Sequence, residues 1–158
     1  VCIVVVPPSE LISQFPTTGK EGEDSSPHHI TVGYLGSVPL ELEGKVTSIV
    51  QRVCESTRAF PIRLSKIGIF ENDEHTVYHS TIKSRKLIRL HDDLKTAFSM
   101  AQMPMDAKYP EYTPHITIEY VPIGAEPQCV PDNPPQGEWI ADSVWLWGFQ
   151  TPHMVFLK

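Results

Sequence analysis

Two stretches of this chain carry nearly the same phrase, His29-Ile30-Thr31-Val32-Gly33-Tyr34 and His115-Ile116-Thr117-Ile118-Glu119-Tyr120. In each copy polar and apolar residues alternate with the period of a β-strand, so His and Thr share one face and the apolar residues fill the other. The copies are far enough apart to belong to separate halves of the structure. If the halves pack around a pseudo-twofold axis, two imidazoles and two hydroxyls meet in one cleft.

Length and composition indicate one folded domain. A chain of 158 residues, with 41% hydrophobic and 20% charged residues, has the size and composition of a globular protein with its own core. No apolar run approaches the roughly 20 residues that a membrane-spanning helix needs. We therefore expect a single domain over residues 1–158, without membrane association, that is either a monomer or one domain of a longer chain.

The cysteine content and the net charge limit the cellular compartments and the kinds of binding partner that we expect. The three cysteines, Cys2, Cys54 and Cys129, are odd in number and widely spaced, which favours a reducing cytoplasm over a disulfide framework or a zinc site. The net charge of −6 argues against a protein that follows long nucleic acid by neutralising many phosphates. A small anionic ligand held by a few focused donors remains compatible with this charge, and no cofactor is expected.

The remaining pattern predicts an α+β domain. Helical spacing of apolar residues indicates helices over 39–57 and 86–102, with one short helical turn within 9–15. Alternation predicts strands at the two phrases, about 28–35 and 113–121, and a hairpin of strands over 60–70 and 76–83. The proline-rich stretch 122–137 should be irregular, and strands near 139–149 and 153–157 close the chain. This order favours two lobes, each a small sheet with a helix on its outer face.

The paired residues suit acid–base chemistry on a phosphate ester. Free histidine titrates near pH ~6.5, so near neutrality one imidazole can accept a proton while the other donates one. Thr31 and Thr117 would donate hydrogen bonds to the non-bridging phosphate oxygens. No metal is required, and no cluster of carboxylates and histidines has the spacing of a metal site. Which histidine is the base and which the acid does not follow from the sequence.

With these motifs the chain resembles the 2H phosphoesterase superfamily, which includes the 2′,5′ RNA ligase-like proteins. Pro27 and Pro114 precede the two H-x-T motifs. Residues 64–70 are similar to the central strand of the family, and residues 145–148 to a late strand of its phage-type members. The resemblance implies a bilobal fold with two small, mainly antiparallel sheets related by a pseudo-twofold axis, outer helices and a central cleft. It also implies metal-independent phosphodiesterase activity, with His29, Thr31, His115 and Thr117 as the catalytic set.

The resemblance implies several substrate classes and does not choose among them. They are 2′,3′-cyclic phosphates, 2′,5′-linked oligonucleotides, ADP-ribose cyclic phosphate and, in viral members, cyclic nucleotide immune signals degraded in the host cytoplasm. For substrate contacts we expect nucleobase stacking on Phe70, Tyr109 or Tyr112, and a second phosphate at Lys83 or Arg85. Tyr34 and Tyr120 alternate onto the apolar face and are expected in the core. His79 and His91, which have no partner pattern, are expected at the surface or in packing.

Other readings of the motifs stay open at this point. The simplest is two edge strands whose polar faces are similar by chance, since Thr and Ile are common in strands; the repeated histidine in the same position weakens it. A second is a non-catalytic nucleotide- or RNA-binding module, which would return its ligand chemically unchanged. A third is a ligase-like protein that processes RNA ends.

Overall fold

Eight β-strands, three α-helices and one short 3-10 helix make up the structure, a computed structural model that describes residues 1–16, 28–106 and 111–158. The helices are α1 (Ser9–Ile12), α2 (Glu43–Glu55) and α3 (Arg85–Met100), with the 3-10 helix η1 (Leu40–Leu42) leading into α2. The strands are β1 (Cys2–Val5), β2 (Ile30–Tyr34), β3 (Phe60–Glu71), β4 (His75–Lys83), β5 (His115–Pro122), β6 (Glu138–Ala141), β7 (Ser143–Trp147) and β8 (His153–Phe156).

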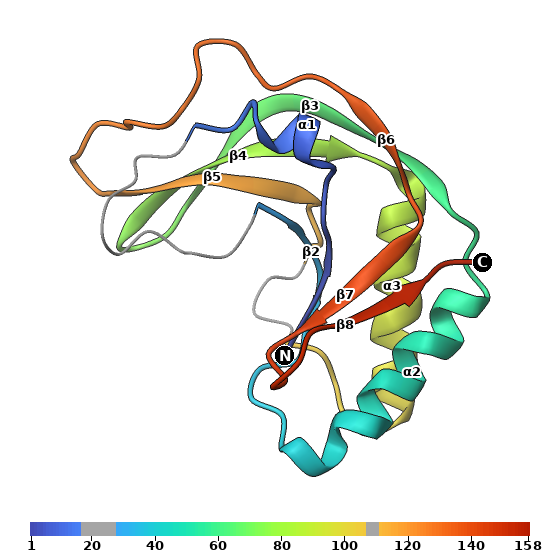
Figure 1. Cartoon of the computed structure of the whole chain (residues 1–158). Coiled ribbons are helices and arrows are strands. Elements are labelled where there is room, and N and C mark those ends of the chain that lie inside the picture. The colour runs from blue at the N-terminus through green and yellow to red at the C-terminus, as the bar shows by residue number, and fades with distance from the viewer. Residues whose placement is uncertain (17–27, 107–110) are drawn as a thin grey trace.

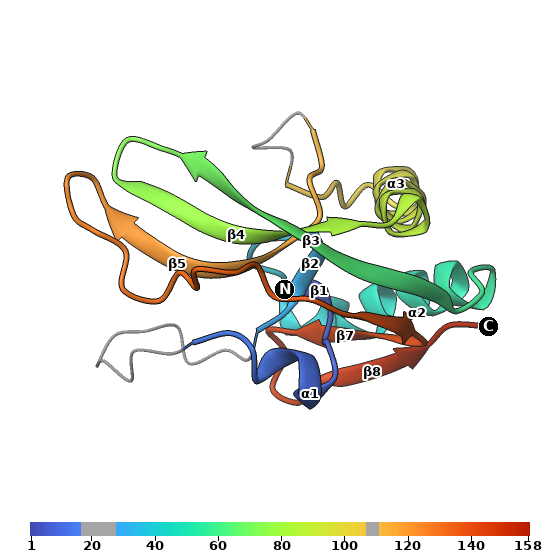
Figure 2. The same ribbon diagram turned by 90° about the horizontal axis from the view of Figure 1, so that it is seen from above.

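The strands form one antiparallel sheet in the order β6-β3-β4-β5-β2-β1-β7-β8. The two motif strands, β5 and β2, are neighbours at its centre. Among the described residues they pair at one position only, Ile30 opposite Ile116, whereas β4 and β5 pair along most of their length. The sheet therefore consists of two four-stranded halves that meet at a single residue pair. Figure 2 shows β3, β4 and β5 above, and β7 and β8 below.

The sheet curls strongly on itself. β6 lies at one edge of the sheet and β7 lies second from the other edge, yet Asp142 alone separates them in the chain. Because one trans residue spans only ~3.8 Å, the end of β6 and the start of β7 must be close in space. Figure 1 shows the chain running from β6 directly into β7. Ala141 and Val144, on either side of this crossing, belong to the core.

The helices α2 and α3 lie side by side on one side of the sheet (Figure 1). Ser84, the residue directly before α3, caps this helix. Its side-chain oxygen accepts a hydrogen bond from the backbone N–H of Leu87 at 3.1 Å, which satisfies one free donor of the first turn. Its buried stripe, Leu87, Leu90, Leu94 and Phe98, packs in the same core as Ile30 and Ile116. The apolar face of the motif strands is thus the helix-covered face.

The predicted α+β class with antiparallel strands and outer helices is confirmed. The two expected sheets are the halves of one continuous sheet, because the Ile30–Ile116 pair joins them. The predicted strand over 139–149 is wrong as one element: β6 pairs with β3 and β7 pairs with β1, so the chain changes halves at Asp142. Within the described ranges, no helix has the length and apolar character to cross a bilayer.

The central pair predicts a strong effect on stability. Ile116→Ala should lower the free energy of unfolding by about 2–5 kcal/mol, because the side chain is fully buried where the two halves meet. Urea unfolding followed by circular dichroism measures this. Ile140→Ala, at a strand position that is 59% exposed, is the matched control and should stay within about 0.5 kcal/mol of the parent protein. Equal effects of the two changes would contradict the role given to the pair.

Candidate active site

The register of the central pair brings the two motifs together. Ile30 and Ile116 lie opposite each other on antiparallel strands, and both are fully buried on the helix-covered side. The residues on either side of them, His29 and Thr31 on one strand and His115 and Thr117 on the other, alternate to the opposite face. Continued in either direction, this register sets each histidine across from the other motif's threonine. The arrangement has the twofold symmetry that the repeated phrase predicts.

Each motif strand carries a β-bulge directly after its threonine. In β2, Thr31 pairs with Val4 and Gly33 pairs with Ile3, which leaves Val32 as the extra residue. In β5, Thr117 pairs with His79 and Glu119 pairs with Tyr78, which leaves Ile118 as the extra residue. A bulge of one residue breaks the alternation, so the residues beyond it change face. The two bulges occupy equivalent places in the repeated phrase.

The bulges overturn the prediction that Tyr34 and Tyr120 belong to the core. Tyr34 is 49% exposed and Tyr120 is 57% exposed, and both line the cavity described below. Strict alternation places them with Ile30 and Ile116, and the extra residue in each strand turns them to the side of the motif histidines. The sequence pattern carries no signal for the bulges, because Val32 and Ile118 are ordinary strand residues.

Within the described residues, β2 and β5 separate beyond their one shared pair. Residues on the chain between α3 and β5 instead donate hydrogen bonds to backbone carbonyl oxygens of β2. The hydroxyl of Tyr112 donates to the carbonyl oxygen of Thr31 at 2.8 Å, and the backbone N–H of Asp106 donates to the carbonyl oxygen of Tyr34 at 2.8 Å. His91, on α3, donates through Nδ1 to the carbonyl oxygen of Val32 at 2.7 Å and stacks on the ring of Tyr112 at 4.0 Å. These contacts form a firm wall on one side of the site.

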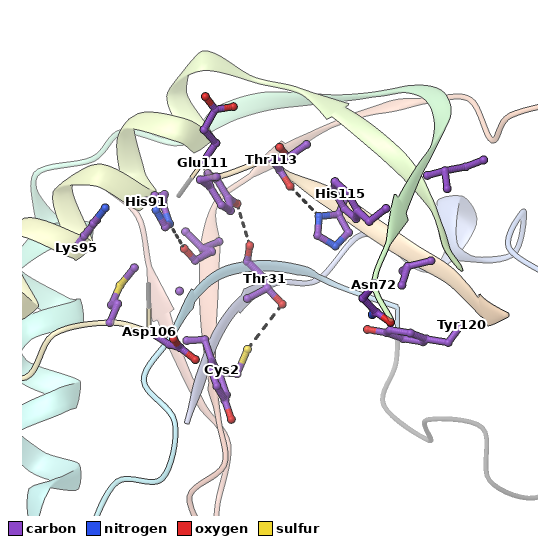
Figure 3. A pocket seen from close by; sticks show the side chains of 18 of the residues that line it. Cys2, Thr31, Asn72, His91, Lys95, Asp106, Glu111, Thr113, His115 and Tyr120 are labelled. Carbon is purple, nitrogen blue, oxygen red and sulfur yellow. Dashed lines mark hydrogen bonds between the residues drawn. The ribbon is translucent and has the colours of Figure 1, made fainter. Parts of the chain in front are cut away.

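A cavity of about 840 Å³ lies against this wall. Thr31 and His115 both line it, with His91 on one side and Asn72 and Tyr120 on the other (Figure 3). Tyr112, which stacks on His91, is also a lining residue. Charged side chains among the described lining residues are Lys95, Glu71, Asp106 and Glu111, so acidic groups outnumber basic ones.

His29 and Thr117 are not among the residues that line this cavity. The ring of His29 meets the ring of Trp147 edge-on, with centroids 4.9 Å apart. His29 nevertheless acts on His115, since the nearby charge of His29 is one of the causes that lower the pKa of His115. The two imidazoles are therefore close enough to interact electrostatically.

The imidazole of His115 is held in one tautomer. Its Nδ1 lies 2.7 Å from the backbone carbonyl oxygen of Thr113, and since a carbonyl can only accept, Nδ1 carries the hydrogen. In the neutral ring Nε2 then has a free lone pair. Burial is the main cause that lowers the pKa of His115, and the positive charge of His29 adds to it, while the Thr113 carbonyl works in the opposite direction. Neutral His115 thus presents a base.

Some of the expected substrate contacts line the cavity and others do not. Phe70 and Tyr112 line the cavity, although the hydroxyl of Tyr112 is engaged with Thr31. Lys83, at the end of β4, and Arg85, at the start of α3, are exposed and do not line it. Tyr109 lies outside the described residues. Their roles as ligand contacts remain predictions.

Sequence reasoning missed the residues that reach the site through neighbouring strands. The orientation of Tyr34 and Tyr120 depends on bulges that the sequence pattern does not reveal. His79 lies opposite Thr117 because β4 pairs with β5. His79 is buried and its ring packs against His115, which agrees with the packing role expected for it. No group of three or more His, Cys, Asp or Glu side chains in the described part of the chain is placed to hold a metal ion together.

Comparison with known proteins places the chain in a family. A model of the 2'-5' RNA ligase superfamily matches residues 10–152, so the chain belongs to this superfamily, the 2H phosphoesterases. A relative from Geobacillus kaustophilus (strain HTA426), named "Putative phosphoesterase GK0864", is 29% identical over 130 residues, which is 78% of this chain and 70% of the relative. Membership supports an activity of the phosphodiesterase type.

Solved structures show the same fold. The crystal structure of TT0787 of Thermus thermophilus matches with a TM-score of 0.72 at 19% identity, over 99% of this chain and 94% of that one. Escherichia coli LigT in complex with 3'-AMP matches with a TM-score of 0.66 at 19% identity, over the same shares of the two chains.

The lowered pKa values of the site predict how stability depends on pH. Burial lowers the pKa of both His115 and His79, whereas in the unfolded chain both titrate near ~6.5. As the pH falls below ~6.5, these two histidines bind protons more readily in the unfolded state than in the folded state. The free energy of unfolding should therefore decrease. Urea unfolding at several values between about pH 5.5 and about 7.5 measures the slope. His115→Gln should flatten it, and an unchanged slope would contradict the assignment.

Proposed function

We propose that this protein is a metal-independent phosphodiesterase that acts on a small nucleotide or short oligonucleotide through His29, Thr31, His115 and Thr117. The observation that carries the proposal is the Ile30–Ile116 pair, which sets both H-x-T motifs on the same face at the centre of the sheet. Family membership supports the same reaction type. A phosphate held between the motifs would be within reach of an imidazole and a hydroxyl from each strand.

The two imidazoles divide the proton transfers. His115, neutral and with a free Nε2, accepts the proton of the attacking oxygen, which is a water or a ribose 2′-hydroxyl. As that oxygen bonds to phosphorus, the bond to the leaving oxygen breaks, and His29 donates the proton that the leaving oxygen needs. Each transfer contributes typically ~10²–10⁴-fold. The roles exchange when the reaction runs in reverse.

The threonine hydroxyls stabilise the charge on phosphorus-bound oxygens. Thr31 lines the cavity, and its Oγ1 lies 3.8 Å from the sulfur of Cys2, a weak partner that leaves the hydroxyl able to donate to a phosphate. The hydrogen bond from Tyr112 to the carbonyl of Thr31 fixes the backbone at this point. Donors that are fixed before the reaction stabilise developing charge without having to reorganise.

The character of the cavity favours a compact ligand with few phosphates and at least one planar base. Phe70, Tyr34 and Tyr120 offer exposed aromatic surface in the cavity that His115 also lines, and bases stack on such surfaces whatever their identity. The acidic side chains Glu71, Asp106 and Glu111 would repel a string of phosphates. E. coli LigT, whose fold this chain shares, has been crystallised with 3'-AMP and with phosphate, which supports a nucleotide ligand.

Removal of either imidazole should lower turnover strongly. His29→Ala and His115→Ala are each expected to lower kcat by about 10²–10⁴-fold, while Thr31→Val and Thr117→Val should cost less. Activity should persist in EDTA. His153→Ala is the matched control, because this histidine is bonded to Glu43 at the start of α2, and it should keep kcat near the parent value.

A screen of candidate substrates separates the alternatives. Chromatography after incubation with 2′,3′-cyclic mononucleotides, 2′,5′-oligoadenylate, ADP-ribose cyclic phosphate and cyclic di- and trinucleotides reports cleavage, and RNA ends report ligation. Binding of a ligand that is recovered unchanged would identify a binding module instead. Full activity in His115→Ala would overturn the proposal.

The aromatic surface makes a separate prediction about affinity. Tyr120→Ala should raise KM by the equivalent of about 1–3 kcal/mol if a base stacks there, with little change in kcat. Tyr120→Phe, which keeps the ring, should behave like the parent protein. Steady-state kinetics on the substrate found by the screen provide the test, and an unchanged KM in Tyr120→Ala would remove this residue from the binding site.

A further inference from the structure

A third histidine stands directly behind the proposed base. His79, on β4, is only 2% exposed, so it does not reach the cavity itself. Its ring stacks on Phe70 with centroids 4.0 Å apart and planes 15° apart. On another side it meets the ring of His115 at 5.1 Å and 63°. Phe70 also touches His115 edge-on at 5.0 Å, so the three rings form one cluster.

Gly68 provides the space that the ring of His79 occupies. The two residues are paired across β3 and β4, and a Cβ on Gly68 would lie 2.6 Å from Nε2 of His79. That distance is too short for any contact, so a side chain at position 68 would force the imidazole to move. The position of the ring therefore depends on a glycine that does not itself border the cavity.

We propose that His79 is a positioning residue for His115: its buried ring, seated over Gly68 and stacked on Phe70, is the support against which the proposed catalytic imidazole rests. This inference rests on the proposed function. The hydrogen bond from Nδ1 to the carbonyl of Thr113 leaves the ring of His115 free to swing about that bond, and the rings of His79 and Phe70 block the swing. Placement of a base within a few tenths of an ångström matters, since a shift of ~1 Å can cost ~10²-fold in rate.

The surroundings of His79 keep its own ring neutral. From β3 it faces Gly68 and Phe70, which are uncharged, and from β5 it faces Thr117 and the titratable ring of His115. On its own strand, its Nδ1 lies 3.4 Å from the carbonyl oxygen of Val77. A neutral, water-excluding ring at this place supports His115 without competing for its proton.

Replacement of the ring tests the proposal without any substrate. In His79→Ala water enters behind His115, so the pKa of His115 should rise toward the value of free histidine. Nitrogen-15 NMR of the imidazole signals across a pH titration measures this, with His115→Gln to assign the signal. His153→Ala is the control and should leave the titration of His115 unchanged. No change in His79→Ala would overturn the proposal.

Gly68→Ala displaces the same ring while every group of the site remains present. We expect kcat to fall by about tenfold to a hundredfold in Gly68→Ala and in His79→Ala. The double variant should be no slower than His79→Ala alone, because the ring that the added methyl would strike is gone and its other close neighbour, Cγ2 of Thr81 at 3.1 Å, needs to move by only a few tenths of an ångström. Gly44→Ala, in α2 where a Cβ would meet nothing within 4 Å, is the matched control and should be as active as the parent.

The two readouts distinguish failure of this inference from failure of the proposed function. If the parent protein cleaves no phosphodiester, the NMR titration of His79→Ala still decides whether His79 supports His115. If the parent is active, additive losses in kcat for Gly68→Ala and His79→Ala would show that the glycine acts independently of the ring. A kcat within about twofold of the parent in His79→Ala would also overturn the positioning role, as an unmoved titration does.

Discussion

The pairing of Ile30 with Ile116 is the constraint on which the rest of the structure depends. Within the described residues it is the only pair that joins β2 to β5, and both side chains are fully buried beneath the helices. Because the residues next to a buried strand position must face the other way, burial of two isoleucines sets His29, Thr31, His115 and Thr117 on the open face. Hydrophobic packing on one side of the sheet thus determines polar geometry on the other. Beyond the pair the strands separate, which leaves room for a cavity bordered by Thr31 and His115.

The symmetry of the two motifs extends further than their histidines and threonines. Each strand bulges at the residue after its threonine, Val32 in one copy and Ile118 in the other, and each bulge turns the following tyrosine toward the cavity. The environments of the two imidazoles nevertheless differ. His115 is supported by Phe70 and His79, whereas His29 meets Trp147. Such a difference is what a pair of proton-transfer groups needs when one is to accept and the other to donate.

The sequence predicts the order of helices and strands, the antiparallel α+β class and the family, because periodic burial and a repeated motif are local signals. It fails where the outcome depends on pairing between distant strands. Alternation places Tyr34 and Tyr120 in the core because the bulges cannot be read from Val32 and Ile118. The proximity of His79 to His115 follows from the β4–β5 register. The split at Asp142 follows from the curl of the sheet, which short-range alternation does not encode.

The central claim is that two imidazoles from different halves act on one phosphorus atom. Nitrogen-15 NMR of both rings during a titration with 3'-AMP, the nucleotide seen in complex with E. coli LigT, examines it most directly. The account predicts that the signals of His29 and His115 shift together along one 1:1 binding curve with a single Kd. A ligand that moves one ring while the other keeps its signal at saturation would contradict a shared phosphate site.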